Sequence, residues 1–477
     1  MYDVVIIGAG IIGTNIAYNL GKYNVKVLVL EQELDIATKT SKANSGIIHS
    51  GYDCLPNSLK AKMNIKGKKL YPELAKRLNF PYKQLGSLVL AFNDEEIKQL
   101  DILYDQGIKN KIETLSIIDH DQIMKLEPNI NDNVKKALYA PDTAIICPYE
   151  ATLAFAENAV LNKVTFSFGQ KVSKIVKTDN HFIINDEIKT QFIINATGVY
   201  SDDVASLIGD DRYQITARKG EYLLLDRSEY LFNHVIFQTP TEMGKGILIV
   251  PTVDGNTMIG PTAVDQIDKE DDSVTQAGID EIKRSITKLT NKINLRKVIT
   301  EFSGLRAIYE DDFVIEPSTI DPHFINLIGI ASPGLASAPA IGEYVIELLT
   351  NQGLNLTLKD NLVTERAKPI RISDLNKTEY DNLIRKYPLY GKIVCRCEKV
   401  SEQEIINAIK DPLPALTLDG IKRRTRAGMG RCQGGFCSIK IMELLSEYQN
   451  VDMTKIYKSS PNSPLVIQKT KTGNLDE

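Results

Sequence analysis

Residues 2–31 read YDVVIIGAGIIGTNIAYNLGKYNVKVLVLE, and this stretch decides the fold. The β-branched run YDVVIIG predicts a buried strand, and the residues after it have the apolar spacing of a helix. Gly8, Gly10 and Gly13 form a G-x-G-x-x-G pattern at the junction, where glycines permit a tight turn and the close approach of a pyrophosphate to the helix N-terminus. A second strand ends at Glu31, an acid placed to accept hydrogen bonds from a ribose. The stretch therefore predicts a Rossmann-like α/β domain for a dinucleotide, and it does not distinguish NAD from FAD.

Length and composition limit the class of protein. The chain has 477 residues, 43% of them hydrophobic and 25% charged, which is typical of a globular protein of about three domains. A formal net charge of -4 argues against a nucleic-acid partner. We find neither a long apolar run nor a signal-peptide pattern, so we expect no transmembrane segment and a cytoplasmic protein, compatible with peripheral association with the inner face of the cell membrane.

Seven further stretches carry a family resemblance. They are TSKANSGIIHSGYD (40–53), LKAKMNIKGKKLYPEL (59–74), GSLVLAF (86–92), ATGVYSD (196–202), GKGILIVPTVDGN (244–256), GPTAVD (260–265) and ASPGLASAPAIGEYV (331–345). In combination they resemble the FAD-dependent oxidoreductases of the D-amino-acid-oxidase superfamily, most closely the glycerol-3-phosphate oxidases and dehydrogenases. The resemblance covers nearly all of residues 1–350 and implies that the dinucleotide is FAD.

The resemblance also implies which residues surround the flavin. Short polar side chains in the 40–53 stretch can bond the diphosphate and ribityl groups, and glycines there, including Gly51, let the backbone approach a flat ring. A helix that begins near Leu335 is expected to direct its positive N-terminal end toward the flavin. The FAD-binding residues expected in this way, beyond Gly8, Gly10, Gly13 and Glu31, are Ser41, Asn44, Ser45, Gly46, Ala196, Gly198, Gly334 and Leu335.

The substrate site follows from the same resemblance. Patterns such as EYLLLD, GILIV and TMIG alternate and predict an inserted antiparallel sheet that covers the flavin. Lys245 and Arg306 match the family's phosphate-binding cations, and Ser332 lies beside them. His49, one of five histidines, is expected to accept the hydroxyl proton while hydride leaves for the flavin; we expect structural roles for His120, His181, His234 and His323. The predicted activity is oxidation of sn-glycerol 3-phosphate to dihydroxyacetone phosphate.

Two other enzymatic activities remain open. L-2-hydroxyglutarate dehydrogenases and oxidases share an NSG-IH-G segment and the following SLKAK, so a 2-hydroxy acid is the alternative substrate. An amine oxidase of the same fold is a weaker alternative. The third alternative is not an enzyme but an iron–sulfur carrier that uses a flavin fold as a scaffold. The presence of His49, Lys245 and Arg306 argues against this alternative.

The last quarter of the chain contains four of the six cysteines. Cys395 and Cys397 form C-x-C, and Cys432 and Cys437 form C-x4-C. This spacing resembles that of the bacterioferritin-associated-ferredoxin-like (BFD-like) domain, a helical module that holds a [2Fe–2S] cluster; structural zinc is the alternative. The resemblance implies electron transfer from FAD through the cluster to a flavoprotein, an iron–sulfur subunit or quinone.

A basic run and the domain boundaries complete the expectations. Lys422, Arg423, Arg424 and Arg426 predict a solvated helix face, or one that compensates cluster charge or binds an acidic partner. We expect an FAD-binding domain from 1–80, 146–212 and 300–360, and a substrate domain from 81–145 and 213–299. A linker (361–390), the [2Fe–2S] domain (391–450) and a tail (451–477) follow.

Overall fold

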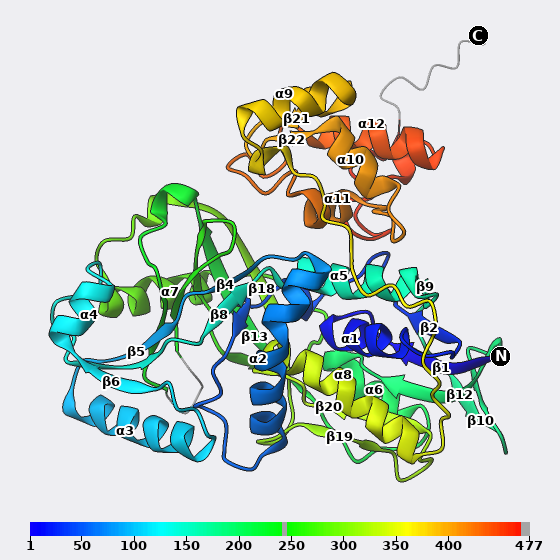
Figure 1. The fold of residues 1–477 in the computed structure, drawn as a ribbon, viewed down its shortest axis with the longest axis horizontal. Coiled ribbons are helices and arrows are strands. Elements are labelled where there is room, and N and C mark those ends of the chain that lie inside the picture. Colours follow the sequence, from blue (N-terminus) through cyan, green and yellow to red (C-terminus); the bar gives the residue numbers. More distant parts are fainter. Residues whose placement is uncertain (241–245, 469–477) are drawn as a thin grey trace. The chain divides into compact units, whose positions relative to one another are not determined.

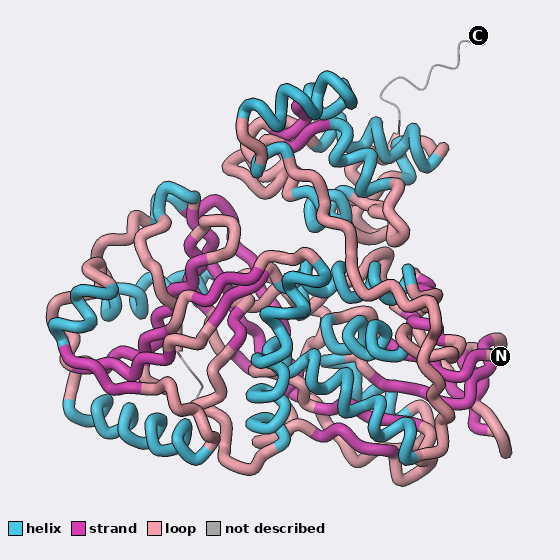
Figure 2. Tube along the Cα trace, in the orientation of Figure 1, coloured by secondary structure: helices cyan, strands magenta, loops and turns pink. Residues whose placement is uncertain are grey.

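The computed structural model describes residues 1–240 and 246–468, which form two compact units. The first unit comprises Met1–Gln32 and Ile36–Ala367, and the second comprises Glu33–Asp35 and the chain from Lys368 onward. The first unit holds two large sheets, and the second is mostly helical (Figure 1; Figure 2).

The first sheet confirms the Rossmann-like prediction. Its central strands are parallel and lie in the order β20 (Phe324–Ile328), β12 (Ile188–Asn195), β1 (Tyr2–Ile7), β2 (Val27–Leu30) and β9 (Thr165–Ser167). The strands β10 (Ile175–Lys177), β11 (Phe182–Ile184) and β19 (Val314–Pro317) add antiparallel pairs. Most residues of β1 and β2 are buried. This explains why their sequences are nearly continuous apolar runs, as is typical of a parallel sheet covered on both faces.

Four helices pack beside this sheet through small residues. They are α1 (Ile11–Leu20), α2 (Leu59–Leu78), α5 (Pro148–Leu161) and α8 (Gly334–Asn351). A Cβ on Gly67 of α2 would lie 2.2 Å from the carbonyl oxygen of Ala336, and one on Gly342 of α8 would lie 2.5 Å from Nδ2 of Asn19. Glycine at both positions therefore lets α8 contact α2 and α1 backbone to backbone.

The second sheet is the predicted insertion, and it is mixed rather than purely antiparallel. Its strands run in the order β17 (Val264–Gln266), β13 (Thr216–Leu225), β16 (Thr257–Gly260), β15 (Leu248–Pro251), β14 (Val235–Gln238), β5 (Ser87–Ala91), β7 (Lys136–Ala140) and β6 (Ser116–Asp119). Only β14 and β5 pair in parallel among these neighbours, because they come from the two separate insertions. Figure 1 shows this sheet beside the Rossmann-like sheet within the first unit, with α3 (Asp94–Lys109), α4 (His120–Leu126) and α7 (Gln276–Leu289) around it.

A long strand and a helix fall across the expected domain boundaries. β18 (Val298–Ile308) pairs with β13 along its whole length, so the boundary expected at 299/300 lies inside one strand. The stretch 361–390, expected to be a linker, contains α9 (Lys377–Lys386). Asn376 and Glu379 form a capping box at the start of this helix, which is a local signal for helix rather than for linker.

The second unit has its own apolar core. Its elements are α9, α10 (Glu402–Ile409), α11 (Leu418–Thr425), α12 (Ser438–Gln449) and the short strands β21 (Ile393–Cys395) and β22 (Val400–Ser401). Ile405, Ile421, Ile441 and Leu445 are among the buried residues that the helices bring together. In the part of the chain that the structure describes, no helix is both long enough and apolar enough to cross a membrane.

A buried carboxylate joins α4 to the second sheet. Glu127 is fully buried, and its Oε1 accepts hydrogen bonds from the backbone N–H groups of Asn233 and His234 at 2.7 and 2.6 Å. The same oxygen lies 2.7 Å from Nδ1 of His234. The side chain of Glu127, from a distant part of the sequence, thus accepts the hydrogen bonds of the backbone N–H groups just before β14.

We predict that Glu127→Ala lowers the free energy of unfolding of the first unit by about 1–3 kcal/mol, because two buried backbone donors lose their acceptor. Urea unfolding followed by the signals of the first unit would measure the loss. Glu127→Gln keeps an oxygen at the same position and should cost clearly less. Equal losses in the two variants would show that charge, and not hydrogen-bond acceptance, matters at this position.

Candidate functional site

A cavity of about 980 Å³ runs between the two sheets of the first unit. Its lining includes most of the residues that the sequence assigned to FAD: Gly8, Gly10, Glu31, Ser41, Asn44, Ser45, Gly46, Ala196, Gly198, Gly334 and Leu335. His49, Arg306 and Ser332, which were assigned to catalysis and substrate, line the same cavity. Lys245 lies outside the described residues. The structure therefore brings the predicted cofactor and substrate residues of the described chain into one space.

The glycine turn forms one end of the cavity. Gly8 has a φ of +104°, and a Cβ there would lie 2.6 Å from the carbonyl oxygen of Ala196. A Cβ on Gly13 would lie 2.0 Å from the carbonyl oxygen of Gly8, so Gly13 packs the turn instead of lining the cavity. Oε2 of Glu31 accepts a hydrogen bond from the backbone N–H of Ala9 at 2.8 Å, which places the acid at the turn. The geometry is that of a dinucleotide cradle.

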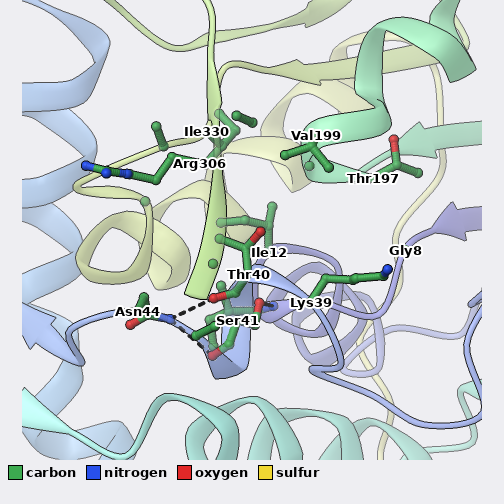
Figure 3. Close-up of a pocket in the computed structure, with 18 of the residues that line it drawn as sticks. Gly8, Ile12, Lys39, Thr40, Ser41, Asn44, Thr197, Val199, Arg306 and Ile330 are labelled. Carbon is green, nitrogen blue, oxygen red and sulfur yellow. Dashed lines mark hydrogen bonds between the residues drawn. The ribbon is translucent and has the colours of Figure 1, made fainter. Parts of the chain in front are cut away.

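The loop 39–46 lies across the N-terminus of α1 (Figure 3). Oγ of Ser41 accepts a hydrogen bond from the backbone N–H of Ile11 at 2.9 Å. Nδ2 of Asn44 donates to the carbonyl oxygens of Thr40 and Ser41, and its Oδ1 accepts from the N–H of Gly46. Asn44 therefore shapes the loop with its own side chain, and Ser41 attaches the loop to the helix that starts at the glycine turn.

The same loop also contacts the second sheet. Oγ1 of Thr40 donates to the carbonyl oxygen of Leu305 at 2.6 Å, and Oγ of Ser45 lies 3.2 Å from the hydroxyl of Tyr222. A Cβ on Gly304 would lie only 2.1 Å from the carbonyl oxygen of Ala43. Gly304 in β18 thus lets the second sheet approach the 39–46 loop, which lines the cavity expected to hold FAD.

His49 is the only one of the five histidines that lines the cavity. Its side chain is mostly buried and its ring centroid lies 5.9 Å from that of Phe237. His234 is held by Glu127, and His120 is exposed beside Asp121 and Asp132, so neither approaches the cavity. His181 lies in a turn with Thr178, and His323 contacts Asp321. Position alone therefore separates His49 from the other four.

Arg306 is a cation whose hydrogen bonds in the described chain go to backbone carbonyl groups. Its Nη2 donates to the carbonyl oxygens of Thr262 and Lys219 at 2.5 and 3.4 Å. Among residues 1–240 and 246–468, no carboxylate lies within ion-pair distance of it. Burial lowers the pKa of this guanidinium, and the charge of the nearby Arg218 lowers it further. A half-buried guanidinium in a cavity, with no carboxylate partner in the described chain, is suited to bind an anion.

The four cysteines of the second unit also converge. Sγ of Cys397 lies 3.8 Å from Sγ of Cys432, and a hydrogen bond from the thiol of Cys437 lowers the pKa of Cys395 to about 6. A Cβ on Gly430 would lie 2.3 Å from Cβ of Cys397, so glycine leaves room beside the thiols. Four thiols, two at and just after the end of β21 and two just before α12, suit a metal cluster bound through thiolates.

Comparison with known proteins agrees with both sites. Residues 3–348 match the family model described as FAD dependent oxidoreductase. The chain belongs to this family of FAD-dependent oxidoreductases. Residues 393–447 match the model of the BFD-like [2Fe-2S] binding domain, so FAD and a [2Fe–2S] cluster are the cofactors of this oxidoreductase.

Three relatives show to which oxidoreductases this chain is similar. It is 44% identical to a glycerol 3-phosphate dehydrogenase of Caloramator mitchellensis over 99% of both chains. The solved structure of L-alpha-glycerophosphate oxidase from Mycoplasma pneumoniae with FAD bound is similar with a TM-score of 0.74 and 35% identity, over 78% of this chain and 99% of that one. Human mitochondrial L-2-hydroxyglutarate dehydrogenase is 32% identical over 55% of this chain and 61% of its own.

The three arginines of the basic run are buried, so the interpretation of the run as a solvated helix face was wrong for them. Arg423, Arg424 and Arg426 are buried, and Arg426 donates from Nε to Glu398 at 2.9 Å. Within the second unit, Asp35 accepts hydrogen bonds from Arg423 and Arg424 at 2.7 and 2.8 Å. The arginines therefore neutralise buried carboxylates of the second unit. Local sequence could not show this, because Asp35 lies nearly four hundred residues away in the chain.

Sequence reasoning also missed two residues that line the cavity, Arg218 and Tyr222. Both lie on β13, and burial raises the pKa of the Tyr222 hydroxyl. The alternation of residues 218, 220 and 222 along that strand was the available signal, since these positions share one face of a sheet.

We predict that Gly304→Ala weakens FAD binding at least tenfold, because the added methyl group would press on the backbone of Ala43 in the cofactor loop. Equilibrium titration of apoprotein with FAD, followed by quenching of flavin fluorescence, would measure the change. Gly391→Ala is a suitable control, since its Cβ would have 3.6 Å of clearance. Unchanged FAD affinity in Gly304→Ala would mean that the loop and β18 separate easily.

Proposed function

We propose that this oxidoreductase converts sn-glycerol 3-phosphate to dihydroxyacetone phosphate and passes the electrons through its [2Fe–2S] cluster to a partner. The observation that carries the proposal is the presence in one cavity of a buried histidine, His49, and a half-buried guanidinium, that of Arg306, which has no carboxylate partner among the described residues. A phosphorylated alcohol needs a base for its hydroxyl and a cation for its phosphate, and these two residues supply both.

The reaction removes a hydride from C2 of the substrate and a proton from its hydroxyl oxygen. FAD bound along the cavity would supply the acceptor for the hydride. His49 takes the hydroxyl proton, and its burial against Phe237 limits the water that could compete for that proton. Arg306 binds the phosphate and thereby orients the carbon chain, and Ser332 offers a hydroxyl at the turn before α8. Lys245 is expected to add a second charge from beyond the described residues.

A 2-hydroxy acid is the alternative substrate, because a carboxylate would also suit Arg306. The choice of glycerol 3-phosphate is supported by sequence identity, which is 44% to the glycerol 3-phosphate dehydrogenase and 32% to the human L-2-hydroxyglutarate dehydrogenase. Anaerobic mixing with each compound would decide, since only the true substrate should bleach the flavin absorbance rapidly. Preference for L-2-hydroxyglutarate would refute the proposed substrate.

The cluster unit supports an electron outlet other than oxygen. A [2Fe–2S] cluster held by the four cysteines accepts electrons one at a time. We assign the next acceptor to a flavoprotein or iron–sulfur protein near the quinone pool, and we place the reaction in the cytoplasm, at the inner face of the cell membrane when that partner is bound there. These assignments rest on the presence of the BFD-like domain beside the FAD-dependent one.

We predict that His49→Ala slows flavin reduction by glycerol 3-phosphate by about a hundredfold to ten-thousandfold, the usual contribution of a general base, while FAD stays bound. Anaerobic stopped-flow absorbance would measure the reduction rate. The control is His120→Ala, which removes an exposed histidine outside the cavity and should leave the rate unchanged. A normal rate in His49→Ala would assign His49 to structure.

We also predict that Cys432→Ser separates the two halves of the reaction. Substrate should still bleach the flavin, because Cys432 belongs to the second unit, but the iron content and the paramagnetic signal of a reduced [2Fe–2S] centre should be lost. Metal analysis and electron paramagnetic resonance of substrate-reduced protein would test this. Ile439→Ala, an exposed change near Cys437, should keep both signals. Zinc in the wild-type protein would refute the electron route.

A further inference from the structure

Three cross-strand pairs form the face of the second sheet that lines the cavity. Arg218 on β13 lies opposite Arg306 on β18, Gly220 lies opposite Gly304, and Tyr222 lies opposite Phe302. Directly opposed residues point to the same side of a sheet. The Tyr222 and Phe302 rings stack with centroids 4.9 Å apart, and the two glycines leave the middle of the face without side chains.

Arg306 uses the space left by Gly220. A Cβ on Gly220 would lie 3.0 Å from Nη2 of Arg306, so the guanidinium passes over β13 at this point. Beyond β13 it donates to the carbonyl oxygen of Thr262, two residues before β17 begins. The guanidinium of Arg306 therefore crosses β13 toward the loop just before β17, the strand whose Asp265 bonds Arg218.

Arg218 is held in place by a carboxylate from β17. Its Nε and Nη2 donate to Oδ1 and Oδ2 of Asp265 at 2.5 and 2.8 Å, a bidentate arrangement. In the described chain Arg218 makes no other hydrogen bond. Its Nη1 can therefore donate to a ligand in the cavity, which Arg218 lines. The hydrogen bonds from Arg218 lower the pKa of Asp265, which keeps the pair ionised.

The charges on this face do not cancel. The three strands β13, β17 and β18 place two guanidiniums here, those of Arg218 and Arg306, and one carboxylate, that of Asp265, which bonds Arg218 alone. A phosphate monoester near neutral pH carries a charge of about -1.5 to -2, and it is bound best by more than one cation. A single carboxylate group carries one negative charge, so L-2-hydroxyglutarate, the alternative substrate, divides its two charges between two separate groups.

We propose that Arg218 is a further phosphate-binding cation, in addition to Arg306 and the expected Lys245, and that its bidentate contact with Asp265 orients it. The proposal rests on the proposed function, because it assigns Arg218 to the phosphate of that substrate. It makes Arg218 a specificity-determining residue that favours a phosphorylated alcohol over a neutral one. The competing explanation is structural: Arg218 would only fasten β17 to β13.

Two variants separate these explanations, because both break the ion pair but only one removes the cation. Arg218→Gln takes the guanidinium out of the cavity, whereas Asp265→Asn leaves it there without its carboxylate. Arg306→Gln serves as the reference for loss of phosphate binding. FAD content and thermal unfolding would establish that each holoprotein is folded.

The readout is phosphate discrimination, the ratio of kcat/KM for glycerol 3-phosphate to kcat/KM for glycerol. A merely structural change lowers both values and leaves the ratio unaltered. We expect Arg218→Gln to reduce the ratio about 10- to 100-fold, the range for one lost charge-assisted hydrogen bond. Asp265→Asn should keep the ratio within about threefold of wild type or raise it, because the amide oxygen still accepts a hydrogen bond that orients Arg218 while the competing negative charge is gone. Binding of inorganic phosphate, measured by calorimetry, should weaken in Arg218→Gln and not in Asp265→Asn.

Other outcomes refute one proposal or the other. An unchanged ratio in Arg218→Gln, or equal losses in Arg218→Gln and Asp265→Asn, would overturn the role of Arg218. If Arg306→Gln loses discrimination while Arg218→Gln keeps it, the proposed function survives and only this inference fails. If wild-type protein oxidises glycerol as well as its phosphate, the proposed function itself fails.

Discussion

The close approach of backbone to backbone at the glycine turn is the constraint on which the first unit depends. Gly13 lies so near the carbonyl oxygen of Gly8 that even one carbon atom would collide with it. This contact sets where α1 leaves β1, and hence where its free N–H groups point. The N–H of Ala9 then meets Glu31, and that of Ile11 meets Ser41. The cofactor cradle is assembled around these few peptide groups.

The chemistry lies where the two sheets of the first unit share one loop. Thr40 and Ser45 contact β18 and β13 from the side of the cofactor loop, and Gly304 removes the side chain that would keep the sheets apart. His49 follows a few residues later, so the base is placed by the same loop that approaches the cofactor. A substrate bound by Arg306 on β18 would therefore lie between the second sheet and the 39–46 loop, which also contacts the N-terminus of α1.

The buried and half-buried arginines of the two units differ in whether carboxylates pair with them. In the second unit the arginines of the basic run are matched by carboxylates: Arg426 by Glu398, and Arg423 with Arg424 by Asp35. In the first unit the cavity keeps an excess of positive charge in its described lining, because Arg306 has no carboxylate and Arg218 takes the one on β17. A matched buried pair avoids the cost of an uncompensated buried charge, whereas an unmatched charge costs stability and is retained where an anion binds.

The sequence by itself determined the features that depend on local spacing. The glycine fingerprint, the acid at the end of β2, the C-x-C and C-x4-C pairs and the alternating strands are all encoded within a few residues, so they predicted the Rossmann-like sheet, the inserted sheet and the cysteine site. His49 and Arg306 could be named only because their surrounding motifs resemble a known family. Tertiary structure decided what depends on register and on distant partners. The place of Arg218 opposite Arg306 follows from the pairing of β13 with β18, and the burial of Arg423 and Arg424 follows from Asp35 at the other end of the chain. A charge pattern shows which residues are ionised, but only the folded chain decides which opposite charges come within bonding distance.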